Sequence, residues 1–190
     1  MVGELEQGML WREGPAMADI YRKWLSHGPR FQTLDRVLSV SERLVIAQAH
    51  GSSPQTQANA SPGALWDFDP ALLDGLAQTV WIWARKVQGS TVLPLGLKAA
   101  RRYDGNPMNG PLTVCCDVIS DPQDPSSVSD IKVYDADGQL CYRLEEFRGQ
   151  SSPQLNRLGG GWQGGELSAQ DQPASVRPLD LAKSLDPTKG

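Results

Sequence analysis

A carboxylate and a side-chain amide lie four residues apart within a long apolar stretch. Asp74 and Gln78 belong to the segment 71–84, which carries almost no charge. Residues i and i+4 of a helix project from one face. A carboxyl group inside a buried helix must be hydrogen-bonded, neutralised or used in chemistry. We therefore interpret Asp74 as a candidate catalytic residue and Gln78 as its partner; a hydrogen-bonded core carboxylate is the structural alternative.

The surrounding stretch has the features of a long buried helix at about 69–87. Asp69 is a good N-cap, and Pro70 suits the first helical position, where no backbone donor is missed. Gly75 costs about 1 kcal/mol relative to Ala in a helix interior, so we expect another segment to approach the backbone closely there. Apolar side chains cover most of the circumference, which predicts that other structure wraps this helix. They are Leu72, Leu73, Leu76, Ala77, Val80, Trp81, Ile82 and Trp83.

The remaining elements predict an antiparallel sheet. A short amphipathic helix at 16–25 ends at Gly28-Pro29. Alternating apolar residues then indicate strands, and a hairpin closes the series. The expected strands are 31–40, 43–49, 92–103, 112–119, 131–134 and 139–144. A single apolar helix flanked by antiparallel strands favours a sheet curled around that helix, which is the α+β hot-dog fold.

Composition sets the domain limits. Residues 1–14 form an uninformative N-terminal extension, and residues 15–150 hold the elements of one domain. A polar loop is expected at 51–63. Ser, Pro, Gln and Gly dominate residues 151–190, which predicts a flexible, linker-like tail.

Charge and cysteine content exclude several classes of protein. The 190 residues carry a formal net charge of −4, which argues against a nucleic-acid surface. With no run of 18 apolar residues and no basic-then-apolar N-terminus, neither a membrane span nor a signal peptide is expected. Three cysteines without metal-ligand spacing fit a reduced, cytoplasmic protein, and two histidines exclude a histidine-rich metal site.

Three motifs, in this order, resemble one family. They are His27-Gly-Pro-Arg-Phe31, then Asp69-Pro-Ala-Leu-Leu-Asp74 with Gln78, then Leu93-Pro94. Together they resemble the C-terminal half of the dehydratase domains of modular polyketide synthases. The resemblance covers residues 20–148 and is closest to the dehydratase-like domains of polyunsaturated fatty acid synthases and related iterative systems.

This resemblance implies a double hot-dog hydro-lyase that dehydrates a β-hydroxyacyl chain held on an acyl carrier protein. A histidine of the first hot dog removes the α-proton, the aspartate matching Asp74 protonates the departing hydroxyl, and the glutamine matching Gln78 hydrogen-bonds that aspartate. No metal or nucleotide is implied, because the substrate arrives on a phosphopantetheine arm. The implied substrate-binding residues are Tyr21, Gly28, Pro29, Phe31, Leu93 and Pro94.

The chain also departs from the family pattern. The first hot dog, with its His-x-x-x-Gly-x-x-x-x-Pro motif, is missing, and Phe68 or Asp69 stands where the family has a histidine before the aspartate helix. His27 occupies a position where tyrosine is common. Three accounts stay open: a fragment of a larger multidomain synthase, a single hot dog that homodimerises, or a relic kept for scaffolding.

His27 has two interpretations. It is either a partly exposed loop histidine, or it reaches across to Asp74 and acts as the missing base. The functional hypotheses are accordingly a dehydratase-like domain, a degenerate hot dog for dimerisation or carrier docking, and a hot-dog acyl thioesterase. The expected partners are an acyl carrier protein, other synthase domains and a second copy of the chain.

Overall fold

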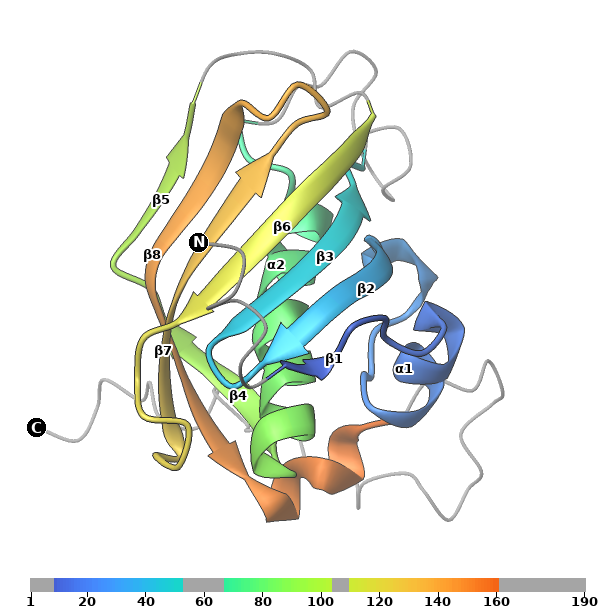
Figure 1. Cartoon of the computed structure of the whole chain (residues 1–190), viewed down its shortest axis with the longest axis vertical. Coiled ribbons are helices and arrows are strands. Elements are labelled where there is room, and N and C mark those ends of the chain that lie inside the picture. Colours follow the sequence, from blue (N-terminus) through green and yellow to red (C-terminus); the bar gives the residue numbers. More distant parts are fainter. Residues whose placement is uncertain (1–8, 53–66, 104–109, 161–190) are drawn as a thin grey trace, which may run out of the picture.

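A curved antiparallel sheet wraps one long helix (Figure 1). The computed structural model describes residues 9–52, 67–103 and 110–160. The strand order is β1-β2-β3-β6-β7-β8-β4, with β5 also paired to β8. The strands are β1 (Met9–Trp11), β2 (Leu34–Ser41), β3 (Leu44–His50), β4 (Thr91–Gly96), β5 (Ala99–Arg102), β6 (Pro111–Val118), β7 (Ser126–Tyr134) and β8 (Leu140–Ser152). The hot-dog prediction is therefore confirmed.

The wrapped helix is α2 (Pro70–Trp83), and its sequence explains both of its ends. Asp69 caps it by accepting hydrogen bonds from the backbone amides of Ala71 and Leu72, each at 3.0 Å. The chain continues as one π-helical turn, η3 (Ala84–Gln88), and stops at Gly89, whose φ of 65° favours glycine. The predicted helix at 69–87 thus exists, with a widened last turn.

Burial follows the strand period of two. Along β6, Leu112, Val114 and Cys116 are buried, while the alternate positions are more exposed. In the neighbouring β3, the small residues Ala47 and Ala49 are fully buried, which lets α2 lie close to the sheet. At the far end of the helix, Trp83 is fully buried and its Nε1 donates to the Glu42 carbonyl at 2.9 Å.

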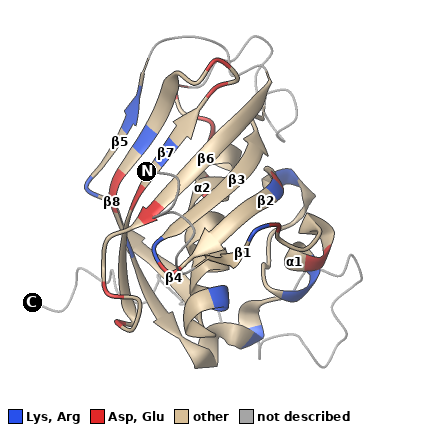
Figure 2. Ribbon diagram, viewed as in Figure 1, with Lys and Arg blue, Asp and Glu red and all other residues tan. Residues whose placement is uncertain are grey.

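The outer face of the sheet carries the charges instead (Figure 2). They form ion pairs across the strands: Lys132–Asp117 at 2.8 Å, Arg143–Asp130 at 2.7 Å and Arg101–Glu145 at 2.7 Å. Cations and anions interleave, so this face holds no large patch of one sign.

Three strand predictions need correction. The strand predicted to start at 31 starts at Leu34, because Pro29–Phe31 form a 3₁₀ turn, η1. The strand predicted at 92–103 is two strands, β4 and β5, since β8 has a bulge at Glu146 (φ 47°) where its partner changes. The strand predicted at 131–134 starts earlier, at Ser126, and is β7.

Helices and strands extend beyond the predicted domain, residues 15–150, at both of its ends. Within the predicted N-terminal extension, β1 pairs with β2 and is followed by α1 (Met17–Lys23). After β8, a 3₁₀ helix, η4, covers Pro153–Leu158. Most of the polar loop predicted at 51–63, and the tail from residue 161, lie outside the described residues. Among the described helices, none has the length and apolar character that crossing a membrane requires.

We expect Asp69→Ala to lower the free energy of unfolding by about 1–2 kcal/mol, because two N-terminal amides of α2 lose their acceptor. Thermal or urea unfolding would measure this loss. Asp137→Ala, in the exposed β7–β8 turn, is the matched control. Equal stability of the two variants would contradict the assigned role of the cap.

Candidate functional site

The predicted Asp74–Gln78 pair exists. The Gln78 side chain is only 1% exposed, and its Nε2 donates to Asp74 Oδ2 at 2.8 Å and to the Phe31 carbonyl at 2.7 Å. The Asp74 side chain is 36% exposed. The amide is therefore held inside the protein, while the carboxylate it holds stays accessible from outside.

Tyr21, from α1, fixes the other end of this amide. Its hydroxyl donates to Gln78 Oε1 at 2.9 Å and accepts from the backbone N–H of Leu34 at 3.3 Å. Burial, together with the nearby Asp74 charge, raises the pKa of Tyr21, so its hydroxyl stays protonated and remains a donor. Because Oε1 faces the tyrosine, the NH₂ group of Gln78 must face Asp74.

His27 contacts the same carboxylate oxygen. Its Nε2 lies 3.3 Å from Asp74 Oδ2, and its side chain is 17% exposed. The imidazole packs edge-on against Trp81, with the ring centroids 5.4 Å apart. Burial lowers the pKa of His27 and the Asp74 charge partly opposes this, so the imidazole is mostly neutral at pH 7. Of the two interpretations of His27, the structure favours the one in which it reaches Asp74.

Thr33 explains the glycine in the middle of α2. A Cβ added at Gly75 would lie 2.0 Å from Thr33 Oγ1, a separation that packed atoms do not tolerate. The same hydroxyl donates to the Ala71 carbonyl at 3.3 Å. The close approach predicted at Gly75 is confirmed. The partner, Thr33, carried no signal in the sequence.

The predicted substrate-binding residues fall into three places. Gly28, Pro29 and Phe31 lie in and beside the η1 turn that follows His27, and the Phe31 ring is exposed. Tyr21 lies behind Gln78, buried from solvent. Leu93 and Pro94 are exposed on β4, and among the described residues no hydrogen bond or ion pair joins them to the Asp74 cluster. Sequence reasoning missed Trp81 as a site residue, because its apolar helix offers many equivalent aromatic positions.

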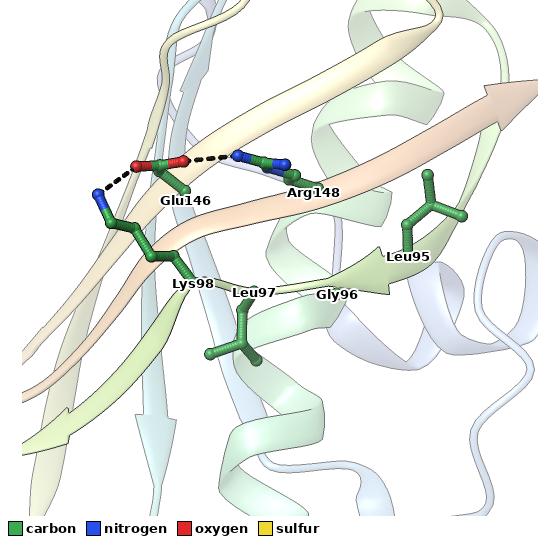
Figure 3. A pocket seen from close by; sticks show the side chains of 6 residues that line it. All are labelled: Leu95, Gly96, Leu97, Lys98, Glu146 and Arg148. Carbon is green, nitrogen blue, oxygen red and sulfur yellow. Dashed lines mark hydrogen bonds and ion pairs between the residues drawn. The ribbon is translucent and has the colours of Figure 1, made fainter.

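A separate hollow lies along β4 and β8 (Figure 3). It has a volume of about 630 Å³ and is lined by Leu95, Gly96, Leu97, Lys98, Glu146 and Arg148. Glu146 bridges the two cations, Lys98 at 2.6 Å and Arg148 at 2.7 Å. The hollow shares no residue with the Asp74 cluster. No group of three or more His, Cys, Asp or Glu side chains within 9–52, 67–103 and 110–160 could hold a metal ion.

The fold and the polar face of α2 define the chain as a dehydratase-like hot-dog domain of a polyketide synthase. Residues 13–158 match the family described as "Polyketide synthase dehydratase N-terminal domain", and the chain belongs to this family. No curated protein matches the sequence.

Solved dehydratase domains share this fold. The dehydratase domain from the CurJ module of curacin polyketide synthase is 21% identical over 81% of this chain and 54% of its own, with a TM-score of 0.58. The dehydratase domain of PpsC from Mycobacterium tuberculosis is 18% identical over 74% of this chain and 53% of its own, with a TM-score of 0.57. The chain therefore spans about half the length of the solved domains it matches.

We expect the NMR titration of His27 to depend on Asp74. His27 should titrate below 6.5, and Asp74→Asn should lower its pKa further, because the opposing carboxylate charge is gone. His50, paired with Asp35 at 2.7 Å, provides the reference signal. Because the folded state then binds fewer protons than the unfolded state, His27 should also reduce stability as the pH falls below about 6.5. An unchanged His27 titration in Asp74→Asn would contradict the contact.

Proposed function

We propose that this chain is the aspartate-bearing, C-terminal half of a dehydratase of the polyunsaturated fatty acid or iterative polyketide synthase type. It would remove water from a β-hydroxyacyl thioester. The observation that supports this most is the meeting of Gln78 and His27 on one oxygen of Asp74. The matched family is described as an N-terminal domain. We propose the aspartate-bearing half instead, because α2 carries the Asp74–Gln78 pair and the motif from His27 to Phe31 precedes it.

The proposed reaction uses one acid and one base. The proposed reaction starts from the form of the pair in which Asp74 is protonated and His27 is neutral, and Asp74 donates this proton to the β-hydroxyl, which leaves as water. His27, neutral near pH 7, accepts the α-proton, and the C–H electron pair forms the new double bond as the C–O bond breaks. The reaction leaves an imidazolium beside a carboxylate, 3.3 Å apart, so direct proton return restores both groups. Gln78 keeps Oδ2 in place throughout, and Tyr21 keeps Gln78 in place.

The substrate in this proposal is carried on the phosphopantetheine arm of an acyl carrier protein. Gly28, Pro29 and Phe31 flank His27 and would contact the acyl chain, and Leu93 and Pro94 would line its path along β4. No metal or nucleotide takes part. We further propose that the chain is part of a multidomain synthase in the cytoplasm. The three free cysteines support the cytoplasmic location.

We expect Asp74→Asn to reduce dehydration of a β-hydroxyacyl carrier-protein thioester by at least about 10²-fold, because the acid is lost. Mass spectrometry would follow loss of water, and gain of water by the enoyl thioester in reverse. Asp35→Asn, an exposed carboxylate paired with His50, is the control. No turnover in either direction, or hydrolysis without an alkene, would refute the dehydratase proposal. Unchanged activity of His27→Ala would assign the base to another group.

A second part of the proposal concerns the edge of the sheet. β4 ends the strand order, and the side chains of Leu93 and Leu95 on β4 and of Leu97 just after it are exposed. Figure 3 shows Leu95 and Leu97. Leu95 is 70% exposed, which is unusual for leucine. An unpaired edge that carries exposed leucines is suited to pairing with another sheet. We propose that a second hot dog, supplied here by a second copy of the chain, pairs at β4.

We expect a dimer in solution that Leu95→Lys converts to a monomer, because a lysine would be buried against the partner strand. Light scattering after gel filtration measures the mass. Ile119→Lys replaces an apolar side chain that is 56% exposed just after β6, and it should leave the dimer intact. A monomeric wild-type chain would contradict pairing between copies.

A further inference from the structure

His27, Phe31 and Thr33 contact α2 at and beside Asp74, and they belong to one short segment, 27–33, here called the entry segment. It is braced internally. The Phe31 amide donates to the Gly28 carbonyl at 2.9 Å, and the Gln32 amide donates to the Pro29 carbonyl at 3.3 Å. The Gln32 side chain reaches back to the His27 carbonyl at 2.9 Å. Because these bonds tie residues 27–32 together, and Thr33 follows directly, the segment should shift as one body.

The entry segment makes its contacts with a single face of α2. Thr33 bonds the Ala71 carbonyl, His27 meets Asp74, and the Phe31 carbonyl accepts from Gln78. The helix positions involved are Ala71, Asp74, Gly75 and Gln78, spaced as i, i+3, i+4 and i+7. At Gly75, the Thr33 Oγ1 atom occupies the space that a Cβ would fill, so the entry segment lies directly against the helix backbone there.

We propose that Gly75 is a positioning residue: its missing side chain seats the entry segment on α2 and so sets the separation of His27 and Asp74. The catalytic consequence rests on the proposed dehydratase function, whereas the geometry does not. A methyl group at position 75 would displace Thr33 Oγ1 by at least about 1 Å, since packed atoms do not approach to 2.0 Å. A shift of that size takes His27 Nε2 out of contact with Asp74.

Helix propensity favours alanine at position 75, whereas packing against Thr33 opposes it. Gly75→Ala should stabilise an isolated helix by about 1 kcal/mol. In this protein, the same change would displace the entry segment and so move His27 away from Asp74. A variant that is folded but has lost the His27–Asp74 contact is therefore the expected product.

The test combines Gly75→Ala with two substitutions of Thr33. Thr33→Ala removes the blocking atom and leaves only the Cβ, which would lie 3.4 Å from an alanine methyl at 75. Thr33→Val keeps a methyl group in place of the hydroxyl, so it is the shape-matched control. In each background, the NMR titration of His27 is measured with and without Asp74→Asn. The difference between the two reports the His27–Asp74 coupling, and His50 is the internal reference.

The coupling should shrink in Gly75→Ala, return in Gly75→Ala/Thr33→Ala and stay small in Gly75→Ala/Thr33→Val. Where turnover is measurable, kcat should fall on the order of 10²-fold and recover in the same pattern. Wild-type coupling in a folded Gly75→Ala would overturn the proposal, as would equal coupling in the two double variants. If Gly75→Ala does not fold, Gly75→Ala/Thr33→Ala compared with Thr33→Ala decides the question. The expected coupling pattern without turnover would support positioning and refute the dehydratase function.

Discussion

The side-chain amide of Gln78 is the junction on which the site depends. It is 1% exposed, and it bonds α1 through Tyr21, the entry segment through the Phe31 carbonyl, and its own helix through Asp74. A buried amide left without these partners would cost about 1–3 kcal/mol for each unmade hydrogen bond. The three segments are thus held in one arrangement by the need to satisfy a single polar group in an apolar environment.

That arrangement also places the charges. Burial keeps Tyr21 in its protonated form and disfavours the imidazolium form of His27. Both groups that flank the Gln78–Asp74 unit are therefore neutral near pH 7, and the one partly exposed member, Asp74, faces outward. The Gln78 amide has its partners inside the protein, whereas Asp74 is partly exposed, so a change of charge in this cluster falls on the His27–Asp74 contact.

The sequence was informative where local rules apply. The cap at Asp69, the i, i+4 pair and the close approach at Gly75 each follow from helix geometry, and the structure contains all three. The identities of the partners were not predictable, since Thr33 and Tyr21 reach α2 only through tertiary packing. The strand at 92–103 was misjudged for the same reason. Its break lies opposite a bulge at Glu146, far away in the chain.

A double hot dog would both supply an acid–base pair and cover the edge of its sheet. In this chain, different parts of the structure meet these two requirements. The proposed dehydration needs an acid and a base that reach the same substrate, and in the proposal both come from one chain, as Asp74 and His27, 3.3 Å apart. Burial of the β4 edge needs a second sheet, because Leu95 and Leu97 are left exposed. The hollow at that edge shares no residue with the Asp74 cluster. Pairing at β4 would therefore act on stability and on the substrate path, whereas the entry segment, α1 and α2 set the geometry of the proposed acid–base pair.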